Sequence, residues 1–244
     1  NNEGYGNLMK IVSKGFVDGF YYRPRVDMEV LERFHEGIIA TSACIAGEVQ
    51  RELLRGDYNK AKETALKYEA CFGKGNFFLE LQDHGLPQQK MVNPQLIRLS
   101  EETGIELVVT NDVHYTYAED VEAHDILLCI QTGKKLQDED RMRYEGGQYF
   151  VKSEEEMRRL FPYAAQALDN TQKIADRCYV DIEFGNMKVP KYDVPEGYTA
   201  WEYLNKLCFD GLTERYPGRE ETLRSRLEYE LDVITRMGFT DYFL

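Results

Sequence analysis

The sequence predicts an α/β fold in which helices cover a parallel sheet, followed by a separate helical segment. Apolar runs alternate with helical patterns through residues 37–133, and these runs are continuous rather than alternately apolar and polar. Such runs are typical of buried parallel strands. Two strong helical patterns from residue 199 onward predict the helical segment. The favoured architecture is an α/β barrel or part of one, and an open sheet is the alternative.

The first half of the chain supplies the expected strands and their covering helices. The helices are expected at residues 5–18, 27–36, 45–73 with a break near Gly56, and 87–103. The strands are expected at residues 37–44, 76–84 and 104–115. Because each strand is followed by helical material, the strands are expected to pair in parallel through helical crossovers.

Beyond residue 115 the alternation ends. The pattern Thr116-x-x-Glu119 predicts a capping box that opens a helix ending at Gly133, and Ser153-x-x-Glu156 predicts a second capping box. Residues 142–153 are expected to form a hairpin or an irregular excursion. Residues 183–198 contain two prolines and predict an extended connector. We therefore expect one domain at 1–190 and a second at 191–244.

Composition limits the possible functions. The formal net charge is −13 and no dense run of Lys and Arg occurs, which works against direct binding of DNA by this segment. No apolar stretch is long enough to predict a transmembrane helix. Five cysteines without C-x-x-C spacing predict a reducing, cytoplasmic setting, with Cys129, Cys178 and Cys208 as core thiols. The chain starts without Met or a signal peptide, as if entered in mid-sequence.

Asp112 and His114 are the first candidate metal ligands. They end the third predicted strand, where residues two apart project to one face. In parallel α/β folds the carboxyl ends of the strands form the edge where sites are built, and carboxylate and imidazole groups bind divalent metals. The alternative is that Asp112 caps a turn and His114 is an ordinary residue of this edge.

Cys44 ends the first predicted strand in the same manner, so its thiolate is the third candidate ligand. The alternative is a buried structural thiol. Glu80, Gln82 and His84 alternate onto one face of the second strand, where they supply hydrogen bonds to the ligands or a further ligand, or only orient the loop starting at Gly85. His124 and His35 are interpreted as structural.

Several sequence motifs together resemble the family of bacterial DNA polymerase III alpha subunits. The motifs, in chain order, are TSACIAGEV, FFLELQDHG, VVTNDVHY, EAHDILLCIQTGK and ELDVITRMGFTDYFL. The resemblance implies that residues 1–190 are the later part of a polymerase-and-histidinol-phosphatase (PHP) domain, a distorted β/α barrel. It implies that residues 191–244 are the connector and helical start of the polymerase core.

The resemblance also implies a metal cluster, with ligand roles for Cys44, Asp112 and His114. The metal would be zinc or manganese, and further ligands would precede Asn1. The polymerase's catalytic aspartates and their magnesium would follow Leu244. The parent protein would be a DNA-directed DNA polymerase that binds primer-template DNA, deoxynucleotides, a sliding clamp and a proofreading subunit.

Four hypotheses for this segment follow. It is a phosphoesterase or proofreading exonuclease module of the polymerase, a structural metal domain that binds partners, a non-catalytic scaffold, or a stand-alone PHP phosphoesterase. The helical end, GFTDYFL, argues against the last. The isolated segment is expected to be inactive, and open strand edges predict that it aggregates or is unstable.

Overall fold

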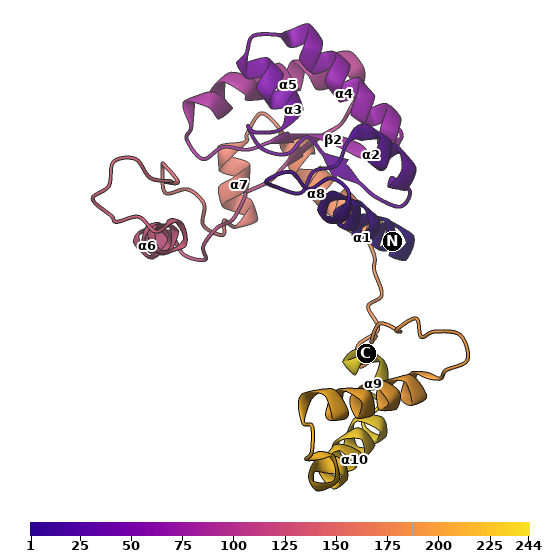
Figure 1. The fold of residues 1–244 in the computed structure, drawn as a ribbon. Helices are drawn as coiled ribbons and strands as arrows, with labels where there is room; N and C mark the ends of the chain where they lie inside the picture. Colours follow the sequence, from indigo (N-terminus) through magenta and orange to yellow (C-terminus); the bar gives the residue numbers. More distant parts are fainter. Residues whose placement is uncertain (187) are drawn as a thin grey trace. The chain divides into compact units, whose positions relative to one another are not determined.

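The computed structural model describes residues 1–186 and 188–244, so Met187 of the predicted connector lies outside the described residues. The chain forms two compact units, Asn1–Asp181 and Ile182–Leu244. The first contains a sheet with helices, and the second is helical (Figure 1). The predicted assignment of 1–190 and 191–244 to two domains of known type stays a prediction.

The first unit is built on a three-stranded parallel sheet. The strands are β1 (Ala40–Thr41), β2 (Phe77–Leu81) and β3 (Leu107–Val109), in the order β1-β2-β3. The register pairs Ala40 with Phe77, and Leu79 with Leu107. The helices are α1 (Asn2–Val17), α2 (Met28–Phe34), α3 (Glu48–Leu54), α4 (Tyr58–Phe72), α5 (Pro87–Thr103), η1 (Ala118–Asp120), α6 (Val121–Thr132), α7 (Glu154–Leu160) and α8 (Ala165–Arg177). Parallel strands joined by helices confirm the predicted α/β class.

The strands β1 and β3 are shorter than predicted. The predicted strand 37–44 contributes two residues to the sheet, and 104–115 contributes three. Ala43 and Asp112 adopt left-handed backbone conformations, with φ of 60° and 46°. A left-handed residue cannot continue an extended strand, so the chain leaves the sheet before each of these positions.

One face of the sheet packs on an apolar core. All five residues of β2 are buried, and Phe77, Leu79 and Leu81 belong to the core cluster. That cluster also includes residues of α3, α4, α5 and α8, among them Val49, Ala65, Leu96 and Leu168. The side chain of Asn170 in α8 donates to the carbonyl of Leu107 at 2.8 Å and so satisfies an acceptor of β3. Packing in the core and the hydrogen bond from Asn170 therefore hold the strands β2 and β3 in place.

Local helix-boundary predictions have mixed outcomes. The Ser153 and Glu156 capping box is confirmed, with the Ser153 amide donating to Glu156 at 2.7 Å, and Gly133 ends α6 at φ 66°. The Thr116 and Glu119 box is wrong. The capping carboxylate is that of Asp120, which accepts from the Tyr117 amide at 2.9 Å. The favourable cap lies one residue later because Tyr117, not Thr116, is the extended residue before the first turn.

Two further predictions concern residues 142–153 and the thiols. The hairpin alternative for 142–153 is wrong, since within the described residues this segment forms only one isolated parallel bridge, Tyr115 with Phe150. Cys129 is buried as predicted, whereas Cys178 is exposed and Cys208 is half-buried. Cys178 lies just past the end of α8, where the chain leaves the core.

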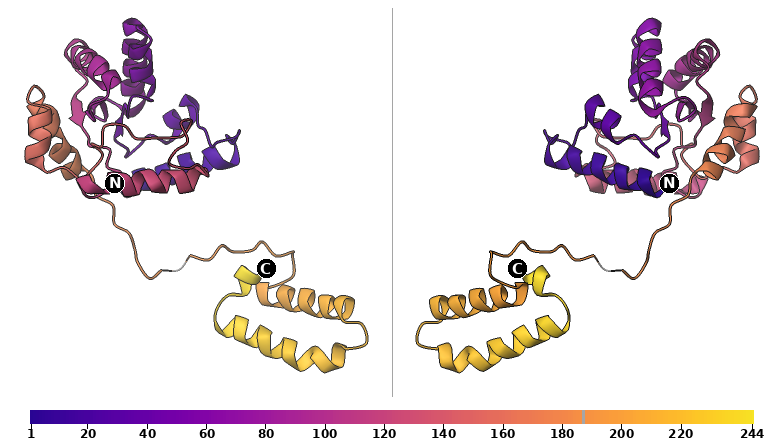
Figure 2. Two further views of the ribbon diagram at one scale, coloured as in Figure 1. Left: turned by 90° about the vertical axis from the view of Figure 1, so that its left-hand side faces the viewer. Right: turned by 90° about the vertical axis from the view of Figure 1, so that its right-hand side faces the viewer.

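The second unit is a helical hairpin with a short third helix. Its helices are α9 (Ala200–Arg215), α10 (Glu220–Arg236) and α11 (Thr240–Phe243). Figure 2 shows α9 and α10 lying side by side. Thr199 and Glu202 form a capping box that starts α9. Across both units, none of the described helices combines the length and the apolar character needed to span a membrane.

Leu79 should be among the costliest positions to truncate, because it lies fully buried in the central strand. We expect Leu79→Ala to lower the free energy of unfolding by about 2–5 kcal/mol through lost burial and a residual cavity. Urea denaturation followed by circular dichroism measures the change. Leu66→Ala, at a 41% exposed position of α4, is the matched control. Equal losses in the two variants would contradict this description of the core.

Candidate metal centre

Two loops at the carboxyl end of the sheet hold the three predicted metal ligands. The loop after β1 contains Cys44, and the loop after β3 contains Asp112 and His114. Each loop includes a left-handed residue that is not glycine. Such a conformation costs about 1–2 kcal/mol, so the surrounding contacts must stabilise it. The loops are therefore held in place rather than free.

Asp112 and His114 lie next to each other, but not for the predicted reason. The expected strand geometry is wrong here, since β3 ends at Val109. The contact arises from the turn: Nδ1 of His114 lies 2.8 Å from the Asp112 carbonyl oxygen, to which it donates, and 3.9 Å from a carboxylate oxygen of Asp112. With Nδ1 donating, Nε2 is the acceptor nitrogen of a neutral His114 ring, the form in which an imidazole binds metal.

Cys44 is half-buried beside a polar interior. Its Sγ accepts a hydrogen bond from the Ala46 amide at 3.5 Å. A cavity of about 10 Å³, enough for a single water, is lined by Cys44, by polar side chains such as Gln50 and Glu80, and by apolar ones such as Ile45 and Val92. Among the lining residues, Gln50 has a buried side-chain oxygen without a hydrogen-bond partner in the described part of the chain. Cys44 therefore lies outside the apolar core cluster and next to polar side chains.

The three donors fit a metal chemically but do not form a complete site. Thiolate, carboxylate and imidazole are the ligand types of zinc and similar ions. Within residues 1–186 and 188–244, no three His, Cys, Asp or Glu side chains lie close enough together to hold an ion. The structure thus brings Asp112 and His114 together and leaves Cys44 outside a three-ligand group.

Tyr149 lies beside the loop that contains Asp112 and His114. Its pKa is raised first by burial and then by neighbouring groups that include Asp112 and Cys44. The Tyr149 carbonyl accepts from the His114 amide at 2.8 Å, and its ring lies 5.4 Å from the ring of His114. Tyr144 packs against the same imidazole at 4.3 Å. These tyrosines, which sequence reasoning missed, form one wall of the candidate site.

The Gly146–Gly147 pair was the available clue to this wall. Gly146 has φ of 88°, and a Cβ at this position would lie 2.6 Å from the His84 carbonyl oxygen. Only glycine fits both the conformation and the close approach. The pair therefore lets residues 144–149 fold over His84 and His114. The sequence predicted an irregular segment here, but it did not predict that this segment contacts the two histidines.

His84 orients the loops and is not a free ligand. It is buried, stacks on Tyr149 at 4.0 Å, and has both ring nitrogens occupied. Nδ1 accepts from Gln89 and Nε2 donates to the Asn111 carbonyl, each at 2.8 Å. Burial is the main cause that lowers the pKa of His84. Of the two predicted roles, the structure favours orientation of the loop.

The other histidines have the structural surroundings expected of them. His124 on α6 packs 5.2 Å from both Tyr115 and Tyr144, and its pKa is lowered first by burial and then by His114. His35 follows α2 directly, and its Nδ1 lies 2.8 Å from the Glu32 carbonyl oxygen.

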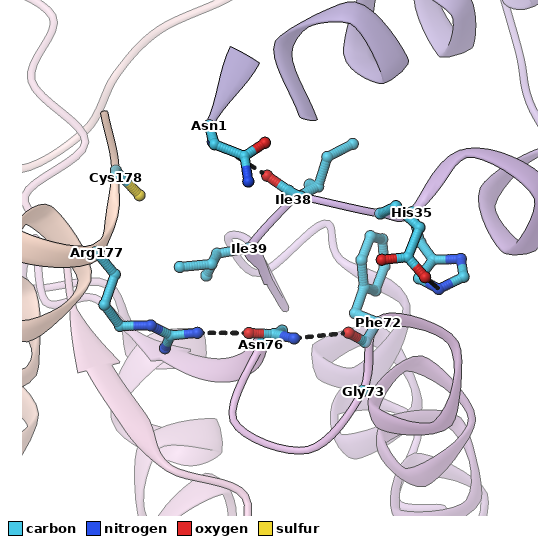
Figure 3. Close-up of a pocket in the computed structure, with 11 residues that line it drawn as sticks. Asn1, His35, Ile38, Ile39, Phe72, Gly73, Asn76, Arg177 and Cys178 are labelled. Atoms are coloured by element: carbon cyan, nitrogen blue, oxygen red, sulfur yellow. Dashed lines mark hydrogen bonds and ion pairs between the residues drawn. The ribbon is translucent and has the colours of Figure 1, made fainter. Parts of the chain in front are cut away.

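A larger cavity of about 420 Å³ lies at the opposite, amino end of the strands (Figure 3). Its polar groups are largely engaged with one another. Arg177 donates to the Gly75 carbonyl at 2.8 Å and to the Asn76 side chain at 2.5 Å, and Asn76 donates to the Phe72 carbonyl at 3.0 Å. Sites in parallel α/β folds form at the carboxyl end, so this cavity is the weaker candidate.

Comparison with known families agrees with this architecture. Residues 1–84 match the PHP domain family, and residues 202–244 match the bacterial DNA polymerase III alpha NTPase domain. Residues 1–84 are thus similar to part of a PHP domain, and the parallel sheet with its helices is consistent with a partial distorted α/β barrel. A PHP domain also implies divalent metal ions.

Relatives align with the chain throughout its length. It is 46% identical to the DNA polymerase III subunit alpha of Treponema pallidum and 44% identical to that of Borreliella burgdorferi, in each case over all of this chain. Identity to the Deinococcus radiodurans subunit is 42% over 98% of this chain. The chain spans 21%, 21% and 18% of these relatives, or about a fifth of their length.

The lowered pKa of His84 makes stability dependent on pH. The unfolded chain binds a proton near pH 6.5, whereas folded His84 does so only at lower pH. We therefore expect the free energy of unfolding to fall as the pH drops below about 6.5. His84→Gln should be less stable at neutral pH but show a shallower decline, measured by urea unfolding at a series of pH values. His35→Gln is the control, and an unchanged slope in His84→Gln would refute the assignment.

Proposed function

The chain is related from its first residue to its last to bacterial DNA polymerase III alpha subunits, and on this basis we propose that its parent polypeptide is a DNA-directed DNA polymerase. The observation that carries the proposal is the 46% identity over the whole chain. The parent would extend a primer on a DNA template with deoxynucleotides, in the cytoplasm and together with other replisome subunits such as a sliding clamp and a proofreading subunit.

Within that polypeptide, residues 1–190 would be the later part of the PHP domain and residues 191–244 the start of the polymerase core. The polymerase-family match at 202–244 supports the second assignment and argues against a stand-alone PHP phosphoesterase. The magnesium site for nucleotide addition would lie elsewhere in the polypeptide. The net charge of −13 supports this division, because contact with DNA phosphates needs basic surface that this segment does not supply.

Cys44, Asp112 and His114 would supply part of a metal site in the PHP domain, with zinc or manganese as the ion. Support comes from the donor types, from the acceptor Nε2 of His114, and from the position of both loops at the carboxyl end of the sheet. The remaining ligands would come from other parts of the polypeptide. When bound, the ion would supply Lewis acidity for phosphoester cleavage or would stabilise the domain.

Neighbouring residues would hold His114 in position to bind the ion. His114 is oriented by its hydrogen bond to the Asp112 carbonyl, and Tyr144 and Tyr149 restrict its ring position. A catalytic PHP domain would act as a phosphoesterase or proofreading exonuclease, whereas a structural one would bind partners.

Primer extension by the purified full-length parent tests the polymerase proposal. We expect template-dependent addition of deoxynucleotides that requires magnesium, because two-metal chemistry stabilises the phosphoryl-transfer transition state. Omission of template and of magnesium are the controls. A full-length protein that binds primer-template but adds no nucleotide would contradict the proposal.

Metal affinity of the same polypeptide tests the ligand assignment. We expect Cys44→Ala, Asp112→Ala and His114→Ala each to weaken zinc binding by roughly tenfold or more, measured by competition with a chromogenic chelator. Cys178→Ala is the matched control, since Cys178 is an exposed thiol outside the candidate site. If Cys44→Ala binds zinc as tightly as the wild type, Cys44 is not a ligand.

A further inference from the structure

Beneath the two ligand loops, a buried carboxylate joins all three strands. Glu80 lies on the face of β2 opposite the apolar core, and the residue is 8% exposed. One oxygen accepts from Thr41 Oγ1 of β1 at 2.5 Å. The other oxygen accepts from the hydroxyl of Thr110, just after β3, and from the side-chain amide Nε2 of Gln82 at 2.8 Å. The carboxylate is thus the common acceptor for side chains at the ends of β1 and β3.

The two threonines occupy equivalent positions in their loops. Thr41 lies two residues before left-handed Ala43, which leads into Cys44. Thr110 lies two residues before left-handed Asp112, which leads into His114. A left-handed residue that is not glycine persists only where its surroundings stabilise it. Because Glu80 holds the residue that enters each such turn, it restrains both turns.

Neighbouring groups reinforce the same link. The Glu80 amide donates to Ser42 Oγ at 2.9 Å. Gln50 donates to the same hydroxyl at 2.7 Å and to the Ala43 carbonyl at 2.8 Å. Gln82 also donates to Thr110 Oγ1 at 3.0 Å. The backbone and the side chain of Glu80 therefore both act on the loop that carries Cys44.

A carboxylate suits this position better than a neutral side chain does. The two oxygens accept three hydrogen bonds, whereas a glutamine has only one acceptor oxygen. In the described part of the chain, no Lys, Arg or His forms an ion pair with Glu80. A buried charge without a cationic partner is costly for stability alone, which indicates a positional role for Glu80.

We propose that Glu80 is a positioning residue that sets the separation of the loops Thr41–Cys44 and Thr110–His114, and so of Cys44 from Asp112 and His114. The inference rests on the proposed metal role of these three residues. Glu80 itself is not a ligand, because its oxygens are engaged by the two threonines and Gln82. It acts on the ion only through the geometry of the loops.

Hydrogen exchange on the metal-free full-length polypeptide tests the link between the loops. In Glu80→Ala we expect faster amide exchange in peptides covering both 41–46 and 110–114, with little change in α9 and α10. Glu80→Gln, which keeps one acceptor, should show a smaller increase. Glu106→Ala is the matched control, because Glu106 is an exposed residue before the opposite end of β3. Faster exchange in only one loop, or uniformly through residues 1–181, would overturn the proposal.

Cobalt substitution tests the effect on the ligands. The wild-type protein loaded with Co²⁺ should show thiolate-to-cobalt charge-transfer absorption from Cys44, absent in Cys44→Ala. We expect Glu80→Ala to bind Co²⁺ roughly 10–100-fold more weakly and to lose much of this absorption at saturation. Glu80→Gln should retain part of the Co²⁺ affinity and part of the charge-transfer absorption. If Glu80→Ala binds with wild-type affinity and spectrum, Glu80 does not position the ligands.

The two measurements separate this inference from the proposal on which it rests. A wild-type protein without thiolate-to-cobalt absorption would overturn the ligand role of Cys44. The exchange experiment needs no metal, so it would still decide whether Glu80 joins the two loops.

Discussion

The two-residue period of the central strand β2 is the constraint on which the first unit depends. Phe77, Leu79 and Leu81 point into the apolar core, and Glu80 and Gln82 point to the opposite face. A register shift of one residue would place the carboxylate among leucines and the leucines against the ligand loops. Stability and site geometry are therefore set by the same pairing of β2 with its two neighbours.

The short edge strands follow from this arrangement. With two and three residues, β1 and β3 make few ladder hydrogen bonds, so they depend on other contacts to hold their ends. Asn170 satisfies the Leu107 carbonyl from α8, and Glu80 holds Thr41 and Thr110 at the carboxyl ends. Side-chain hydrogen bonds thus replace sheet length at the place where the chain must turn sharply into the candidate site.

Sequence reasoning was most accurate where the determining interactions are local. The Ser153 and Glu156 capping box, the helix Pro87–Thr103 and the left-handed Gly133 depend on residues within one turn of each other. The parallel sheet was also predictable, because buried strands and amphipathic helices have distinct periods. The conformation of the loops was not predictable from the sequence. Whether Asp112 continues a strand depends on Tyr149 and Glu80, which lie more than 30 positions away.

In the candidate site, too, some residues were predictable from the local sequence and others were not. The donors Cys44, Asp112 and His114 were identifiable because each follows an apolar strand, and their metal role stays a prediction. Tyr144 and Tyr149 were not identifiable from the sequence, because they occupy an irregular segment without periodicity. They reach His114 only through the chain conformation that Gly146 permits.

The charge of Glu80 connects its hydrogen bonds with metal binding at this edge of the sheet. The carboxylate of Glu80 is buried without a cationic partner among the described residues, and it accepts from Thr110, two residues before Asp112. Burial of the Glu80 carboxylate raises the cost of folding, whereas the carboxylate of Asp112 is exposed to water. A divalent cation bound at this edge would favour both negative charges. The hydrogen bonds of Glu80 therefore define the geometry of the loops, and the bound ion would stabilise the negative charge that this geometry requires.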